Sequence, residues 1–236
     1  MSRVVLVTGG SRGIGRATCE AFLAEGATVL ACGRTPPAAP LPAGVGFLAC
    51  DVADAGAVAA MFAEIRARHG RLDVLVNNAG IAGSNRLDGD DALWHAIIDA
   101  NLHGTYHCAK AALPLLPDGT GRIVNVSSVL GFKAVADQTA YVTAKHAVIG
   151  FTRSLALALA PRRITVNAVA PGWVATDMAA QRYGEIGITE AEANAGTPTG
   201  RITQPAEVAG LIAFLASGAA ANMTGQVLTI DGGDTL

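Results

Sequence analysis

Short apolar runs alternate with amphipathic stretches along the whole chain. The runs predict seven strands, near Val4–Thr8, Thr28–Cys32, Val45–Cys50, Val74–Asn77, Arg122–Ser127, Ile164–Val169 and Val227–Ile230. Most of the segments between them repeat apolar residues at helical spacing. Strands that alternate with helices form parallel sheets with helices on both faces, and the near-continuous apolar runs suit strands buried on both sides. The pattern therefore predicts an α/β domain.

One connection departs from this alternation. After the second predicted strand, residues 34–44 read Arg-Thr-Pro-Pro-Ala-Ala-Pro-Leu-Pro-Ala-Gly. Proline fixes φ and lacks the backbone N–H that a helix needs, so Pro36, Pro37, Pro40 and Pro42 disfavour a regular helix. We expect an extended loop there.

Length and composition suit one compact enzyme domain, residues 1–236. The chain is 51% hydrophobic and 15% charged, with 28 glycines and a net charge of −2. Nothing in it is basic enough for a nucleic-acid partner. No segment reaches membrane-spanning length, and the first residues lack a signal-peptide pattern. We expect a cytoplasmic protein without a nucleic-acid or membrane partner.

The cysteines and histidines show no disulfide or metal pattern. The cysteines lack Cys-x-x-Cys spacing and are Cys19, Cys32, Cys50 and Cys108. We expect them to be buried and reduced. His103 and His107 have helical spacing beside Cys108, but no glutamate follows the first histidine as in zinc proteases. We interpret both as packing or solvated histidines and expect no metal.

A glycine-rich turn follows the first predicted strand. Residues 8–15 read Thr-Gly-Gly-Ser-Arg-Gly-Ile-Gly, and a helical pattern continues through Ala24. Glycines at a strand-to-helix turn let the backbone approach a ligand, and the helix N-terminus offers unpaired N–H groups to a phosphate. The turn predicts a site for a nucleotide pyrophosphate.

The residues near the second strand indicate which dinucleotide binds. NAD-binding folds place an acidic residue about 20 residues beyond the turn to hold the ribose 2′-hydroxyl. Here no acidic residue occurs from Gly26 to Cys50; Gly33 holds the expected position, Arg34 follows it, and Arg12 lies in the turn. Two guanidiniums without a carboxylate favour a 2′-phosphate, hence NADP(H) over NAD(H). The alternative for either arginine is a solvated surface charge.

Tyr141 and Lys145 are the candidate proton-transfer pair. Residues four apart lie on one face of a helix. Tyrosine titrates near pH ~10, and an opposite charge within a few Å moves a pKa by roughly 1–3 units, toward useful proton exchange. By spacing alone, a solvated pair is the alternative.

Three motifs together resemble the short-chain dehydrogenases/reductases, over essentially the whole chain. The turn at 8–15 is similar to the family's Thr-Gly-x-x-x-Gly-x-Gly, residues 77–80 read Asn-Asn-Ala-Gly, and Tyr141-x-x-x-Lys145 is similar to its active-site pair. The resemblance implies a single-domain Rossmann fold with a seven-stranded parallel sheet in the order 3-2-1-4-5-6-7. The proline-rich stretch departs from the family, which usually has a helix beside the adenosine pocket.

The resemblance assigns roles to four side chains, and each role has a physical reason. Tyr141 exchanges a proton with the substrate oxygen while a hydride moves to or from the nicotinamide. Ser128 hydrogen-bonds the same oxygen and stabilises the charge that develops there. Lys145 lowers the tyrosine pKa and holds the nicotinamide ribose, and Asn101 carries a water that links Lys145 to solvent. The alternatives are a strand-end cap for Ser128 and a helix-bend cap for Asn101.

The same resemblance implies the rest of the cofactor site. Asp51 and Val52 would meet the adenine, and the residues after the sixth strand would meet the nicotinamide end. The predicted cofactor-binding residues are Gly9, Ser11, Arg12, Gly13, Ile14, Gly15, Arg34, Thr35, Asp51, Val52, Asn78, Ala79, Gly80, Tyr141, Lys145, Pro171, Gly172, Val174 and Thr176.

Residues 175–200 are the expected substrate lid, where the family places its most variable substrate loop. Their polar, glycine-containing composition, with the acidic run at 189–192, is typical of a mobile segment that closes over an active site. Arg182 and Arg201 flank the lid and are either solvated charges or contacts for a phosphate or carboxylate on a carrier arm. The predicted pocket residues, with ordinary packing as the alternative, are Trp173, Met178 and Tyr183.

The resemblance also implies a homotetramer. The tail at 225–233 is similar to the family's final strand, which commonly packs against a partner subunit, as do the helices that carry Tyr141 and Trp94. Trp94 is interpreted as a core or interface residue.

We therefore expect an NADP(H)-dependent reductase of a small carbonyl substrate, reversibly an alcohol dehydrogenase. Within the family the chain looks most like 3-oxoacyl-carrier-protein and acetoacetyl-CoA reductases, with polyketide ketoreductases and reductases of cyclic or aromatic ketones as close alternatives. The rival enzyme is an NAD-dependent secondary-alcohol or hydroxy-acid dehydrogenase. The rival from another class is a non-catalytic nucleotide sensor, which would not need both Tyr141 and Lys145.

Overall fold

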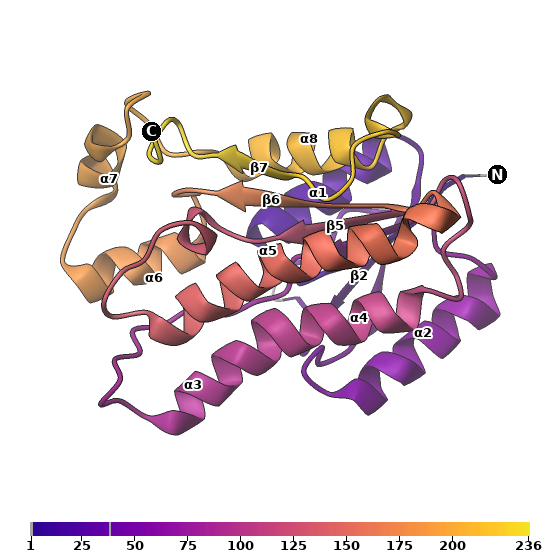
Figure 1. Ribbon diagram of the computed structural model, residues 1–236, viewed down its shortest axis with the longest axis horizontal. Helices are drawn as coiled ribbons and strands as arrows, with labels where there is room; N and C mark the ends of the chain where they lie inside the picture. Colours follow the sequence, from indigo (N-terminus) through magenta and orange to yellow (C-terminus); the bar gives the residue numbers. More distant parts are fainter. Residues whose placement is uncertain (1, 38) are drawn as a thin grey trace.

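The computed structural model describes residues 2–37 and 39–236 of the chain. It has a single seven-stranded sheet, all parallel, in the order β3-β2-β1-β4-β5-β6-β7 (Figure 1). The strands are β1 Val4–Thr8, β2 Thr28–Gly33, β3 Val45–Ala49, β4 Val74–Asn77, β5 Arg122–Val126, β6 Thr165–Pro171 and β7 Val227–Ile230. The predicted fold and strand order are confirmed, and the predicted strand ends differ by no more than two residues.

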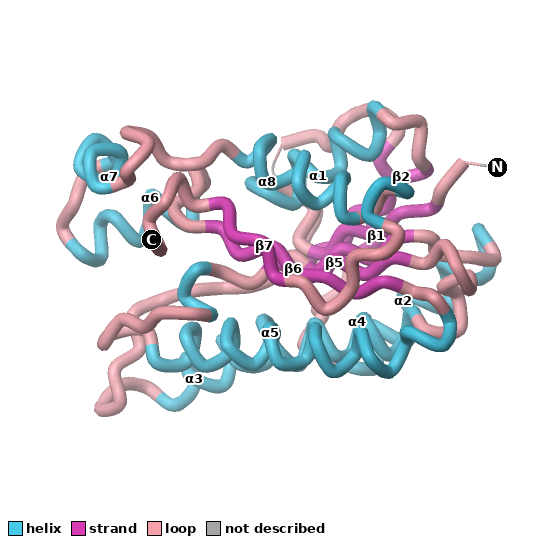
Figure 2. Tube along the Cα trace, turned by 45° about the horizontal axis from the view of Figure 1, so that its top comes forward, coloured by secondary structure: helices cyan, strands magenta, loops and turns pink. Residues whose placement is uncertain are grey.

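Helices cover both faces of the sheet. They are α1 Gly13–Ala24, α2 Ala55–His69, α3 Asp91–Ile98, α4 Gly104–Ala112, α5 Thr139–Leu159, α6 Asp177–Ile186, α7 Glu190–Gly196 and α8 Pro205–Leu215. Figure 2 shows α1 and α8 on one face and α2, α4 and α5 on the other. Across the described residues, no helix combines the length and apolar character needed to cross a membrane.

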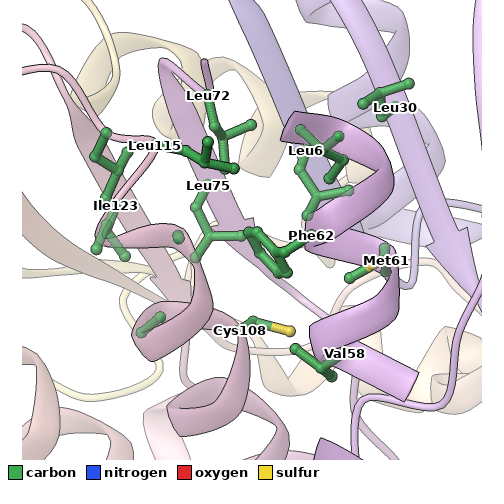
Figure 3. Packing of buried hydrophobic residues seen from close by; sticks show 14 of the residues in the cluster. Leu6, Leu30, Val58, Met61, Phe62, Leu72, Leu75, Cys108, Leu115 and Ile123 are labelled. Atoms are coloured by element: carbon green, nitrogen blue, oxygen red, sulfur yellow. The ribbon is translucent and has the colours of Figure 1, made fainter. Parts of the chain in front are cut away.

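The strands supply side chains to two apolar clusters, one on each face. In β1, Leu6 packs toward α2 and α4, whereas Val5 and Val7 pack toward α1 and α8, as the alternation of a strand requires. Figure 3 shows the first cluster, where Phe62 of α2 approaches Leu75 of β4. The predicted burial of the cysteines is confirmed, since all four are buried and unpaired.

The proline-rich connection contains no helix or strand in its described residues, 34–37 and 39–44, in line with the prediction. Part of that prediction, Ala38, lies outside the described residues. The connection is attached to α1, because Arg16 donates a hydrogen bond to the Pro40 carbonyl at 2.9 Å. Leu41 also packs against the apolar cluster beneath α1.

The segment predicted as a lid forms two helices, α6 and α7, beyond the carboxyl ends of β6 and β7 (Figure 1). Thr176 caps α6, and Thr189 with Glu192 forms a capping box on α7. The two helices share a small apolar cluster that includes Ala179, Tyr183 and Ala193. The polar composition concealed this cluster, because its apolar residues are few and separated in sequence.

Candidate active site

One cavity of about 330 Å³ opens at the carboxyl ends of the strands, where ligands bind in open α/β sheets. It collects residues from segments that lie far apart in the sequence. The predicted residues among those that line it are Ile14, Asn78, Gly80, Asn101, Ser128, Tyr141, Lys145, Pro171, Gly172, Trp173, Val174, Thr176 and Met178. The four predicted catalytic side chains thus share a single cavity.

Tyr141 and Lys145 lie on the first turns of α5 and face the cavity together. The Lys145 ammonium lies 5.3 Å from the centre of the Tyr141 ring, within the range of a cation–π contact. Lys145 is only 5% exposed. Its Nζ donates a hydrogen bond to the Val126 carbonyl at the end of β5, at 2.9 Å. The amine is therefore held at the seam between helix and sheet.

Burial shifts the pKa values of this pair in opposite directions. It raises the pKa of Tyr141 to about 12, an effect that the neighbouring Ser128 hydroxyl opposes. It lowers the pKa of Lys145 to about 8, since a charged amine loses hydration in an enclosed site. The sequence led us to expect that Lys145 would lower the tyrosine pKa. In this structure burial raises the pKa of Tyr141 instead, and Tyr141 is a protonated phenol at neutral pH.

Ser128 follows β5 and begins a 3₁₀ turn over Val129–Gly131. Its Oγ accepts a hydrogen bond from the Leu130 N–H at 3.1 Å, so it caps this turn while it lines the cavity. The adjacent Ser127 points elsewhere: its hydroxyl donates to the Lys145 carbonyl at 2.9 Å. Both serines line the cavity, but the Ser127 hydroxyl is used to join the strand end to α5.

Asn101 lies in a π-helical turn, Asp99–His103, between α3 and α4. Its Nδ2 donates to the carbonyls of Ile81 and Ile97, each at 2.8 Å. Its Oδ1 is buried and has no hydrogen-bond partner among the described residues. Single π turns often occur at functional sites. The wider turn points a buried acceptor at the space beside Gly80 and Lys145, since a Cβ on Gly80 would lie 2.4 Å from Oδ1 and 3.8 Å from Nζ.

The glycine turn is joined to the end of β4 by hydrogen bonds. The Thr8 hydroxyl accepts from the backbone N–H groups of Asn78 at 2.9 Å and Ala79 at 3.0 Å. In return, Asn78 Nδ2 donates to the carbonyls of Thr8 and Gly9. A Cβ on Gly15 would lie 2.2 Å from the Gly9 carbonyl oxygen, so only glycine fits. This contact presses the start of α1 against the turn.

The start of α1 leaves backbone donors available. No side chain caps it, and its first turn contains no acidic residue. Such an end attracts an anion through its N–H groups and its dipole. The tight glycine contacts, the free N–H groups and the orphan Asn101 oxygen fit a dinucleotide that runs from α1 to Lys145.

Several predicted cofactor residues lie outside the cavity lining, along the same edge of the sheet. Arg12 is exposed and pairs with Asp177 of α6 at 3.6 Å. Arg34 and Thr35 are exposed after β2. Asp51 follows β3 and accepts from the Ala53 N–H at 3.0 Å. The remaining members of this group are Gly9, Ser11, Gly13, Gly15, Val52 and Ala79.

Tyr183 is the predicted pocket residue that does not line the cavity. It is 7% exposed and packs in the apolar cluster that α6 and α7 share. Its ring centre lies 5.0 Å from that of Trp173, which does line the cavity. Tyr183 thus supports the pocket wall from behind.

The cavity also has walls that the sequence reading missed. Ile186 lies on α6 with Met178 and Arg182 at spacings of four, and this helical stripe could have revealed it. Leu130, Lys133, Val135 and Gln138 lie between Ser128 and Tyr141, and Asp234 comes from the C-terminal tail. No local pattern indicates that the tail reaches this cavity.

His103 and His107 each lie within hydrogen-bonding distance of an oxygen atom. His103 Nδ1 lies 2.7 Å from Asp99 Oδ1, and His107 Nδ1 lies 3.1 Å from the Val52 carbonyl. In the described residues no three His, Cys, Asp or Glu side chains are grouped for metal binding. Arg201, outside the cavity lining, is exposed and holds Glu207 through both terminal nitrogens at 2.7 Å.

Comparisons with known proteins agree with this geometry. A family model described as enoyl-(acyl carrier protein) reductase matches residues 9–235. The 3-oxoacyl-[acyl-carrier-protein] reductase FabG of Vibrio harveyi is 40% identical over 241 residues, which span 98% of this chain and 96% of that protein. Ligand-free Thermoplasma acidophilum aldohexose dehydrogenase has a TM-score of 0.92 at 38% identity, covering 99% and 94% of the chains. ElxO with NADP bound has a TM-score of 0.90 at 34% identity, covering 99% of each.

The burial of Lys145 predicts a pH dependence of stability. Its pKa is about 8 in the folded protein against an ordinary value of 10.5. Between these values the unfolded chain binds more protons, so this group makes the free energy of unfolding rise with pH. Relative to Lys145→Met, the wild-type free energy of unfolding should rise by roughly 1 kcal/mol per pH unit between pH 8 and 10. Urea denaturation of both proteins without cofactor measures this difference.

The cysteine thiols also affect stability in this range, because burial raises their pKa in the folded protein above the ordinary value of 9.0, but they are present in both proteins and cancel. Lys110→Met, on the exposed face of α4, is the matched control, and its difference from wild type should not rise with pH. Parallel curves for wild type and Lys145→Met would contradict the burial of a titrating amine.

Proposed function

The chain belongs to the short-chain dehydrogenase/reductase family, and we propose that it is an NADP(H)-dependent reductase that converts a ketone to a secondary alcohol. That it is an oxidoreductase follows from the family. The observation that supports the rest is the convergence of Tyr141, Ser128, Lys145 and Asn101 on one cavity beside the glycine turn. No one of these side chains would suffice, because the reaction needs a proton donor, an oxyanion donor and a proton supply together.

Tyr141 is the general acid of this proposal. With its pKa raised to about 12, the phenol is protonated at neutral pH and can donate to a carbonyl oxygen as negative charge grows there. Ser128, which lines the same cavity, donates a second hydrogen bond to that oxygen. When bound, the nicotinamide supplies the hydride in reduction and accepts it in the reverse direction.

Lys145 stabilises the phenolate that Tyr141 leaves behind, because its ammonium lies 5.3 Å from the ring centre. It also faces the region where the nicotinamide ribose would lie. The unpartnered Oδ1 of Asn101 lies next to this amine, in position to accept from a water that would return protons from solvent. Removing Asn101 Oδ1 would slow reprotonation without altering the Tyr141 hydroxyl.

The cofactor lies, in this proposal, along the carboxyl edge of the sheet. The pyrophosphate meets the start of α1, Asp51 and Val52 meet the adenine, and the strand ends at Asn78–Gly80 and Pro171–Thr176 border the nicotinamide side. Arg12 and Arg34 would hold a 2′-phosphate, since both are exposed at this edge. The hydrogen bond from Arg16 to the Pro40 carbonyl limits the movement of the loop that follows Arg34.

The substrate is proposed to be a 3-oxoacyl thioester or a related ketone. This rests on the similarity to 3-oxoacyl reductases and on a cavity whose far wall is apolar, formed by Leu130, Trp173, Met178 and Ile186. Residues 175–200 would act as the lid over this substrate, since Met178, Arg182 and Ile186 of α6 already contribute to the wall. The reaction would take place in the cytoplasm, where such cofactors are present and buried thiols stay reduced.

Replacing the proton donor tests the mechanism. Tyr141→Phe keeps the ring and removes the hydroxyl, so turnover should fall roughly 10³-fold or more. The Kd for NADPH, measured by fluorescence titration, should change by no more than about threefold. Tyr106→Phe on α4, outside the cavity, is the matched control and should retain full turnover. An active Phe variant would overturn the assignment of Tyr141.

The cofactor preference depends on Arg34. Arg34→Ala removes a guanidinium from the proposed 2′-phosphate site, so the KM for NADPH should rise roughly tenfold or more. The KM for NADH should change by about twofold at most, and Arg68→Ala on α2 should change neither. Spectrophotometric assays with both cofactors measure this, and equal effects on the two would exclude a phosphate contact at Arg34.

We further propose a homotetramer that uses the α3–α4–α5 face and the α8–β7 face. Large apolar side chains are exposed on these helices, with Leu157 of α5 at 79%, Tyr106 of α4 at 44% and Phe214 of α8 at 42%. Light scattering coupled to size exclusion should give four times the 23.8 kDa chain mass. Leu157→Asp should reduce this mass, whereas Leu87→Asp in the loop after β4 should not. A monomeric wild-type protein would overturn the proposal.

A further inference from the structure

The charged side chains at the rim of the substrate cavity are already paired with each other. Apart from Lys145, the cationic residues among the described residues that line the cavity are Lys133 and Arg182. They stand in an otherwise largely apolar wall. Whether either can receive an anionic substrate depends on what each already holds.

Arg182 of α6 is engaged through both of its terminal nitrogens. Its Nη2 donates to both carboxylate oxygens of Asp137, at 2.9 and 2.8 Å, and its Nη1 donates to Glu185 at 3.1 Å and to Ser84 at 2.9 Å. The Arg182 side chain is only 13% exposed. Burial raises the pKa of Asp137, but the hydrogen bonds and charge of Arg182 outweigh it and hold that pKa below its ordinary value. The pKa of Glu185 is lowered as well, so the carboxylates of Asp137 and Glu185 are both ionised at neutral pH.

Lys133 is engaged by the C-terminal tail. Its Nζ lies 2.5 Å from Asp234 Oδ2 and 3.4 Å from the Asp234 carbonyl oxygen, in the C-terminal tail. This pair joins the loop after Ser128 to the end of the chain. The two rim cations are therefore paired with three carboxylates, those of Asp137, Glu185 and Asp234, so these five groups together carry one net negative charge.

From this arrangement we infer that Asp137 and Asp234 determine substrate specificity by reserving the rim cations, so that the cavity accepts uncharged ketones and rejects keto acids. The inference rests on the proposed reductase function and narrows its substrate class. A carboxylate that enters the cavity loses its hydration and finds both rim cations, Lys133 and Arg182, already paired, whereas an ester, thioester or cyclic ketone carries no charge to desolvate. Keto acids are rejected because the carboxylates of Asp137 and Asp234 repel them, as well as because the cavity wall is apolar.

The experiment compares a ketone ester with the free acid of the same ketone. Ethyl 3-oxohexanoate and freshly prepared 3-oxohexanoate are assayed with NADPH at pH 7, where the acid is ionised. For the wild type, kcat/KM for the ester should exceed that for the acid by about 100-fold. In Asp234→Asn, which releases Lys133, this ratio should fall by about tenfold, and Asp137→Asn should lower it through Arg182.

Asp118→Asn is the matched control. It removes an ion pair of the same kind, with Arg162, at the opposite edge of the sheet, and it should leave the ratio at the wild-type value. Asp137 holds α6 through Arg182, so the thermal unfolding of Asp137→Asn is compared with that of wild type. If this variant is destabilised, Asp234→Asn in the half-buried tail is the variant that decides the test.

The outcomes separate the inference from the function on which it rests. A wild type that reduces neither compound, nor a cyclic ketone, overturns the reductase function and the inference with it. A wild type that reduces ester and acid with similar kcat/KM overturns the inference alone. A high wild-type ratio that Asp234→Asn leaves unchanged also overturns it, because the apolar wall would then be the cause of the selectivity.

Discussion

The site depends on a buried lysine, Lys145, that both donates a hydrogen bond to the end of β5 and accepts one from the residue that follows this strand. Lys145 donates from Nζ to the Val126 carbonyl, while its own backbone carbonyl accepts from the Ser127 hydroxyl. These two bonds fix the first turns of α5 against the end of β5. Burying an amine in this way is unfavourable by itself, as the lowered pKa of Lys145 shows. The same contacts between α5 and the end of β5 place Tyr141 and Ser128 together in the lining of one cavity.

Much of the fold follows from apolar runs that are readable without a structure. Strands such as β1 and β4 are buried on both faces, so their positions before the polar strand ends, Thr8 and Asn77, are all apolar and the signal is continuous. The glycine turn is equally readable, since the Gly9 and Gly15 backbones meet at a distance that excludes a side chain. Strand ends such as Gly33 and Pro171 are harder to read from the sequence, because pairing with the neighbouring strand determines where a strand stops. Sequence reasoning thus succeeds where a local steric rule operates.

The sequence motifs predicted the candidate catalytic residues, but they did not predict most of the residues that form the cavity walls. Tyr141 and Lys145 could be selected from their helical spacing. The direction in which their pKa values shift could not, because it depends on how deeply the folded chain buries them. The π turn at Asn101 has no local sequence signature, and Asp234 reaches the cavity only because the tail after β7 folds back toward Lys133. The sequence left open whether Arg182 is solvated or contacts a ligand. Its partners Asp137 and Ser84 lie 45 and 98 residues away in the chain, so only the fold reveals them.

The Arg182 contacts connect substrate selection to the placement of the proton donor. Asp137, which Arg182 holds, precedes α5, and its carbonyl accepts from the Asn85 N–H at 2.6 Å. Asn85, in turn, accepts from the Thr139 hydroxyl through both its carbonyl and its side-chain oxygen, at 2.9 and 3.0 Å. Thr139 is the first residue of α5, two positions before Tyr141. The ion pair between Arg182 and Asp137 is thus part of the network that fixes the start of α5, so α6 and Tyr141 are positioned by the same contacts.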